Sequence, residues 1–116
     1  RFNQEADSLN FSMLGPDAAP GTEEFDLFVK EVAREMTVKA GQKCTAIRRT
    51  FVPDSMVDDV VKALSARLSG VKIGDPSVDG VRMGPLAGRA QVTEVGKALG
   101  LLRSGAEVAY GGGDFD

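Results

Sequence analysis

Residues 45–52 read TAIRRTFV, and residues 53–70 read PDSMVDDVVKALSARLSG. The first run is rich in β-branched and aromatic residues, which favours a strand, and Pro53 ends it. The second run predicts a helix with Asp54 or Ser55 as its N-cap and with Gly70 after its last turn. Its apolar residues recur at helical spacing: Met56, Val57, Val60, Val61, Leu64 and Leu68.

The chain upstream repeats this order of a strand followed by a helix. Residues 9–14 (LNFSML) alternate apolar and polar side chains, which predicts a short strand, and a loop follows. Thr22 is a candidate N-cap for a helix that extends to about Val38 and that Gly41 breaks. One face of that helix is apolar: Phe25, Phe28, Val29, Val32 and Met36.

Downstream, residues 71–73 predict a short extended piece, and residues 74–88 predict a long loop rich in Gly, Pro and Asp. A third helix is expected over residues 89–104, and a short strand over residues 106–110. Apolar residues mark one face of that helix: Val92, Val95, Leu99 and Leu102. Alternation of strands with helices favours an α/β fold with a largely parallel sheet.

Composition places the chain among globular proteins of one domain. It has 116 residues, of which 42% are hydrophobic and 27% charged. The net charge of -3 and the pI near 5.0 argue against a nucleic-acid partner, which requires a basic face. Lys and Arg are scattered, so we expect no membrane-binding patch either.

The sequence predicts a cytoplasmic location. No apolar run reaches the length of a membrane span, and no signal-peptide pattern is present. A single cysteine cannot form an internal disulfide, which suits a reducing compartment. Because the chain begins at Arg1 without Met, we expect it to be an excerpt of a longer polypeptide.

The chain contains no histidine, which excludes several catalytic sites. A Ser-His-Asp triad, a Cys-His dyad and a His-bearing zinc site cannot be built from it. A metal site would need oxygen ligands alone, and the acidic residues are dispersed, so none is expected. Catalysis by this chain must therefore use Cys, carboxylate, Lys or backbone groups.

Cys44 is the first candidate for such a group. It lies between the Gly41 turn and the predicted strand, where backbone N–H groups can point at a substrate. Lys39 and Lys43 are near in sequence and would favour the thiolate, the form that attacks. A free cysteine is equally a common small residue of protein cores, and the local sequence leaves both interpretations open.

Glu5 is the second candidate, a carboxylate just before the first predicted strand. It is suited to reach a cleft at the end of the sheet, and equally to be a solvated surface acid. The run Gly111-Gly112-Gly113 lacks the Lys and Ser/Thr that complete a phosphate-binding loop.

Taken together, these segments resemble the aldehyde dehydrogenase superfamily in order and spacing, over essentially the whole chain. The interval from Glu5 to Cys44 is close to the usual separation of base and nucleophile in that family. The matching segments are Glu5, Gly41-Gln42-Lys43-Cys44, Arg49-Thr50-Phe51-Val52, Gly74-Asp75-Pro76, Gly84-Pro85-Leu86, and Gly105-Ala106 through Gly111-Gly112.

One subgroup fits better still. The run EADSLN over residues 5–10 departs from the common Glu-Leu-Gly-Gly-Lys pattern. Together with MTVKAGQKCTAIRR over residues 36–49, it is similar to the dehydrogenase domain of the bifunctional phenylacetate-degradation family. That family joins an aldehyde dehydrogenase to a hydratase-like domain that opens the oxepin-CoA ring.

The resemblance implies a fold, a domain and partners. It implies a three-layer αβα fold with a mostly parallel sheet, of which residues 1–116 are part of the catalytic domain, without the nucleotide-binding domain. The cofactor would be NADP or NAD, bound mainly outside this chain, so the excerpt alone is expected to have no turnover. The partners implied are an aldehyde, here a CoA-linked semialdehyde, a fused hydratase domain, and further copies in a homo-oligomer.

The resemblance also implies roles for the two candidates. Cys44 would add to the aldehyde as nucleophile, and Glu5 would activate the water that hydrolyses the resulting thioester. The N–H of Cys44 would contribute to the oxyanion hole.

Other functions remain open at this point. A relative that forms acyl-CoA would pass the acyl group to CoA, although such enzymes generally lack the base that Glu5 would provide. Other aldehyde or amino-semialdehyde dehydrogenases differ only in substrate. A scaffold or oligomerisation module would keep the apolar helix faces without catalysis, and a redox-sensing Cys44 is a further alternative.

Overall fold

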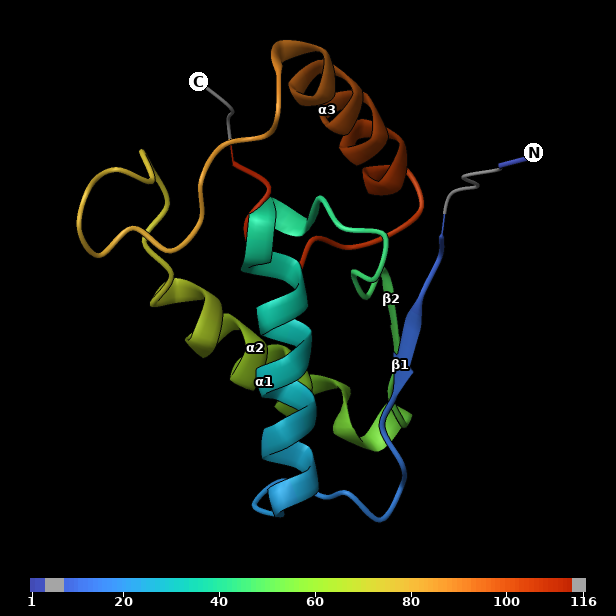
Figure 1. Cartoon of the computed structure of the whole chain (residues 1–116). Coiled ribbons are helices and arrows are strands. Elements are labelled where there is room, and N and C mark those ends of the chain that lie inside the picture. The colour runs from blue at the N-terminus through green and yellow to red at the C-terminus, as the bar shows by residue number, and fades with distance from the viewer. Residues whose placement is uncertain (4–7, 114–116) are drawn as a thin grey trace.

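A short parallel sheet confirms the predicted strand direction. The computed structural model describes residues 1–3 and 8–113, and Figure 1 shows the path of the chain. Strand β1 (Phe11–Met13) pairs in parallel with β2 (Arg49–Phe51), with Ser12 opposite Thr50. Strand β2 is shorter than the predicted strand over residues 45–52, because Thr45 lies in a turn and residues 46–48 belong to no helix or strand.

The core lies where helix α1 (Glu23–Thr37) crosses α2 (Val57–Ser69), beside the sheet (Figure 1). Phe28 of α1 and Val60 of α2 are both buried there. The other buried members of the cluster are Leu14, Ala18, Phe25, Val29, Val32 and Met56. The two apolar faces expected from sequence therefore meet, although Met36, expected on the α1 face, is 45% exposed.

One predicted cap is confirmed and the other is wrong. The Thr22 hydroxyl accepts a hydrogen bond from Phe25 N, at 3.3 Å, so it caps α1. Neither Asp54 nor Ser55 caps α2, because they form a short 3₁₀ turn, η2 (Asp54–Met56), ahead of it. Met56 occupies the N-cap position and makes no side-chain cap.

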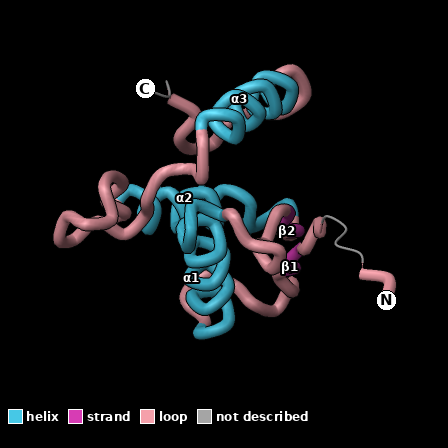
Figure 2. The backbone as a smooth tube through the Cα atoms, turned by 45° about the horizontal axis from the view of Figure 1, so that its top comes forward, coloured by secondary structure: helices cyan, strands magenta, loops and turns pink. Residues whose placement is uncertain are grey.

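The third helix, α3 (Arg89–Arg103), forms as predicted but has no buried residue. Figure 2 shows it apart from the α1–α2 pair, at the end of the long loop. Just before that loop, the extended piece expected at residues 71–73 makes a single parallel bridge, from Ile73 to Met83 of the loop. The loop is thus closed at its base.

The strand expected over residues 106–110 does not form. This segment is exposed along its length and has no hydrogen-bonded neighbour strand among the described residues. An extended segment becomes a β-strand only through a ladder with another strand, so its β-branched and aromatic residues do not suffice. In the part of the chain that the structure covers, no helix has the length and apolar character needed to cross a membrane.

Candidate active site

Cys44 lies in a turn that follows a run of left-handed backbone. After α1, the 3₁₀ turn η1 (Val38–Gly41) has φ of 53° at Lys39, 52° at Ala40 and 72° at Gly41. Only glycine adopts such angles without steric cost, so two non-glycine residues in a row store strain there. The strained turn reverses the chain at the end of α1, and the Cys44 side chain is exposed just beyond it.

The segment before β1 holds the carbonyl group of Cys44. Asn10 Nδ2 donates to Cys44 O at 2.6 Å and to Ala46 O at 3.3 Å, and Ser8 Oγ also donates to Cys44 O. The backbone N–H of Arg48 donates in turn to Asn10 O at 3.0 Å. The two segments that were expected to carry the base and the nucleophile are therefore joined by hydrogen bonds.

Gln42 joins the same turn to the long loop. Its Nε2 donates to Lys39 O at 2.9 Å and to Pro85 O at 3.4 Å, and its Oε1 accepts from Ala87 N at 2.7 Å. A single amide side chain thus connects two of the segments on which the sequence resemblance depends.

Lys43 is turned toward α1. Its ammonium Nζ lies 2.7 Å from Glu35 Oε1, and the two side chains are 20% and 14% exposed. Because this charge is paired with a carboxylate, Lys43 does not offer a free ammonium group to the Cys44 thiol. Lys39, the other cation expected to act on the thiol, is exposed.

Glu5, the expected base, lies outside the described residues. The nearest described residue after it is Ser8, whose hydroxyl contacts the Cys44 carbonyl. The sequence did not single out Ser8, Asn10 or Glu35. A polar residue at the start of an apolar strand is a weak signal for Asn10, and nothing local distinguishes Glu35 from the other acids of α1.

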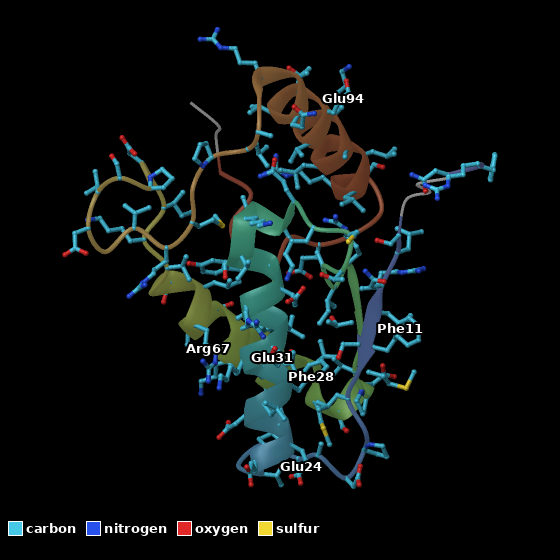
Figure 3. All side chains as sticks on the ribbon, viewed as in Figure 1. Phe11, Glu24, Phe28, Glu31, Arg67 and Glu94 are labelled. Atoms are coloured by element: carbon cyan, nitrogen blue, oxygen red, sulfur yellow. The ribbon has the colours of Figure 1, made fainter. Side chains whose placement is uncertain are left out.

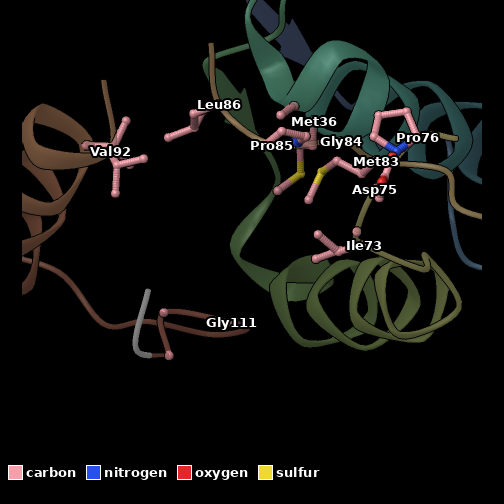
Figure 4. Close-up of a pocket in the computed structure, with 15 residues that line it drawn as sticks. Met36, Ile73, Asp75, Pro76, Met83, Gly84, Pro85, Leu86, Val92 and Gly111 are labelled. Atoms are coloured by element: carbon pink, nitrogen blue, oxygen red, sulfur yellow. The ribbon is translucent and has the colours of Figure 1, made fainter. Parts of the chain in front are cut away.

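An apolar cavity of about 900 Å³ opens beside the turn but does not include Cys44. Figure 4 shows its wall, to which Met36, Ile73, Met83, Leu86 and Val92 contribute side chains. At its edge, the backbone N–H and hydroxyl of Ser77 bind the Asp75 carboxylate and hold its pKa below the ordinary value. Among the described residues, no group of three His, Cys, Asp or Glu side chains is placed to bind a metal ion.

The sequence model of the aldehyde dehydrogenase family matches residues 20–116. The chain is 53% identical, over its full length, to 3,4-dehydroadipyl-CoA semialdehyde dehydrogenase of Aromatoleum evansii, and it covers 23% of that protein.

Solved structures agree with the sequence match. A variant of apo betaine aldehyde dehydrogenase from Staphylococcus aureus, with a BME-modified cysteine, superposes with a TM-score of 0.84 at 26% identity. That match covers 97% of this chain and 22% of the other. Lactaldehyde dehydrogenase from Escherichia coli gives a TM-score of 0.75 at 27% identity, over 92% of this chain and 21% of that one.

The chain therefore spans about a quarter or less of the length of these relatives. Its α/β fold is that of the matching part of an aldehyde dehydrogenase. The family match, the high identity to one relative over the full chain and the structural likeness agree, and this chain belongs to the aldehyde dehydrogenase family.

Proposed function

We propose that the chain carries the nucleophile of an aldehyde dehydrogenase, that Cys44 is that nucleophile, and that the substrate is a CoA-linked semialdehyde. The observation that carries the proposal is the placement of Cys44: an exposed thiol just beyond a strained turn, with its carbonyl held by Asn10. Backbone strain gathers where a functional group must be held in one geometry. The substrate class is supported by the 53% identity of the chain to 3,4-dehydroadipyl-CoA semialdehyde dehydrogenase of Aromatoleum evansii.

In this proposal, the Cys44 thiolate adds to the aldehyde carbon and forms a thiohemiacetal. The carbonyl oxygen gains negative charge, and the N–H of Cys44 donates a hydrogen bond to it. A nicotinamide dinucleotide, bound mainly outside this chain, would supply the hydride acceptor needed to oxidise this adduct to a thioester on Cys44. Thiolates are good leaving groups, so the thioester is ready for hydrolysis.

Glu5 would serve as the base of that hydrolysis. It takes a proton from water, the hydroxide adds to the thioester carbon, and the Cys44 thiolate leaves as the acid is released. Support for this role comes from Ser8, three residues after Glu5 in the sequence, whose hydroxyl contacts Cys44 O.

The described residues do not fit the dinucleotide itself. The glycine run that ends the described chain is used internally, because Arg103 Nη2 donates to Gly112 O. A Cβ on Gly112 would lie 3.0 Å from both Arg103 and Val108, and the run lacks the Lys and Ser/Thr of a phosphate-binding loop. We therefore propose that NADP or NAD binds mainly to polypeptide outside this chain. A betaine aldehyde dehydrogenase of similar structure is known in complex with NAD+, which supports the cofactor class.

Further parts of the proposal concern the full-length protein. Residues 1–116 would form one part of its catalytic domain. By resemblance, the protein would be a cytoplasmic homo-oligomer, with a hydratase domain fused to the dehydrogenase.

Two substitutions in the full-length protein test the mechanism. Cys44→Ala should abolish semialdehyde oxidation, whereas Glu5→Gln should allow one rapid burst of NADPH and then slow turnover, because the thioester accumulates. Mass spectrometry of the Glu5→Gln protein after the burst should show acyl-Cys44. Undiminished oxidation by the Cys44→Ala protein would contradict the proposal and leave a non-catalytic scaffold as the function of this part of the protein.

The product separates hydrolysis from transfer to CoA. Free acid is expected from the wild-type protein with the semialdehyde and NADP. A new CoA thioester, formed only when free CoA is added, would instead assign the chain to the acyl-CoA-forming relatives.

A further inference from the structure

The peptide unit between Lys43 and Cys44 sets the direction of the backbone N–H that is the proposed oxyanion donor. Its carbonyl belongs to Lys43, and its N–H is that of Cys44, the proposed oxyanion donor. A peptide unit is planar and, when trans, directs its C=O and N–H in opposite directions. All described peptide bonds of the chain are trans, so any contact that fixes Lys43 O also fixes the direction of the Cys44 N–H.

Arg48 holds the carbonyl side of this peptide. Its guanidinium Nη2 donates to Lys43 O at 3.2 Å, and the backbone N–H of Ala46 donates to the same oxygen at 3.3 Å. The hydrogen bond from Ala46 N–H closes the local turn. Arg48 adds a charged donor that belongs to the segment leading into β2.

Glu35 holds the side chain of the same residue. Its Oε1 lies 2.7 Å from Lys43 Nζ, and it is the less exposed partner, at 14%. The other carboxylate oxygen, Oε2, is buried and has no hydrogen-bond partner within the described residues. A largely buried carboxylate with one cation as its described partner restrains that cation, because moving the ammonium would leave the charge uncompensated.

We propose that Glu35 and Arg48 are positioning residues, which hold Lys43 by its ammonium and its carbonyl and so aim the Cys44 N–H at the aldehyde oxygen. This inference rests on the proposed function. Neither side chain needs to touch the substrate. Glu35 acts from the last turns of α1, and Arg48 acts from the start of the strand segment, so the peptide is held between two elements of the fold.

The test uses the full-length protein with Glu35→Gln and Arg48→Gln, measured by steady-state and single-turnover oxidation of the semialdehyde. Misplaced oxyanion donors slow the chemical step, so the single-turnover rate and kcat should fall by about 10- to 100-fold, with KM nearly unchanged. A merely structural role would lower the fraction of active enzyme, not the single-turnover rate of the sites that remain.

Two matched controls make the same chemical changes elsewhere. Glu31→Gln removes an acid of α1 whose ion pair with Arg34 is exposed, and Figure 3 labels Glu31 on that helix. Arg103→Gln removes an exposed arginine that donates to a backbone carbonyl, that of Gly112. Both controls should keep single-turnover rates within about twofold of wild type, the change expected at surface sites.

A double substitution tests whether Glu35 and Lys43 act as a pair. Lys43→Gln should slow single turnover as Glu35→Gln does, and the double variant should be no slower than either, because they break the same contact. Should Glu35→Gln fail to fold, Arg48→Gln tests the same peptide from an exposed position.

Single-turnover rates of Glu35→Gln and Arg48→Gln equal to those of the controls would overturn the inference. In that case Cys44→Ala still decides the proposed function by itself. Loss of oxidation in Cys44→Ala would leave the nucleophile assigned and only the positioning role refuted.

Discussion

Asn10→Ala should slow aldehyde oxidation by the full-length protein, because it removes the main side-chain contact with Cys44, the proposed nucleophile. Asn10 Nδ2 donates to Cys44 O at 2.6 Å and to Ala46 O at 3.3 Å. The backbone bonds of Asn10, which accept from Arg48 and Arg49, do not depend on the side chain and should survive. The substitution therefore loosens the turn without removing the start of the sheet.

The magnitude follows from the two hydrogen bonds. Each contributes about 1 kcal/mol net, so at most about 2 kcal/mol of positioning is lost. If all of it is lost from the transition state, kcat/KM falls by about 30-fold. Ser8 Oγ also donates to Cys44 O, and with that compensation the loss is about 1 kcal/mol, or roughly fivefold.

Steady-state oxidation of the semialdehyde gives kcat/KM, and thermal unfolding reports whether the protein stays folded. Ser104→Ala is the matched control, because it removes a side-chain bond to a backbone carbonyl, Leu101 O at 2.7 Å, at the exposed end of α3. Its kcat/KM should equal that of wild type. A kcat/KM of Asn10→Ala within about twofold of wild type would refute the idea that this amide holds the nucleophile in place.

Two further predictions concern the helix pair and the strained turn. Phe28→Ala should destabilise the protein by about 3–5 kcal/mol in denaturant unfolding, whereas Leu27→Ala, its 54% exposed neighbour on α1, should cost far less. Gly41→Ala should destabilise by about 1–2 kcal/mol, since φ is 72° there, while Gly70→Ala, at φ of −82°, should not. Equal stability losses within either pair would contradict the packing or the backbone argument, respectively.

The helices were predictable from sequence because their signals are local. The apolar face of α1 and the Thr22 cap are both visible within a few turns of chain, and both are found. The strand expected over residues 106–110 failed for the opposite reason. A strand depends on a partner strand that its own residues do not specify. Helix α3 needs no such partner for its backbone hydrogen bonds, so it forms even though its apolar face is not buried.

The residues of the candidate site likewise differ in whether a local sequence signal marks them. Cys44 and Gln42 stand out in the sequence through a family motif, and Gln42 proves to join two such motifs. Asn10 and Glu35 could not be found in this way, because Asn10 acts on Cys44 from a segment 34 residues away and Glu35 acts on Lys43 only through the turn that follows α1. Their roles exist only once α1, β1 and β2 are assembled.

The chain exposes a large surface for its mass, and polar contacts hold the turn around Cys44. The chain exposes 8941 Å², whereas a compact monomer of 12.2 kDa exposes about 6,100 Å². Large apolar side chains account for part of the excess, among them Leu101 at 75% and Ile73 at 65% exposed. The turn around Cys44 is held by the directional contacts of Asn10, Gln42 and Lys43, next to the buried Ala46. Polar contacts in a partly exposed site are weaker individually than core packing, so the geometry of Cys44 should depend on several of them acting together.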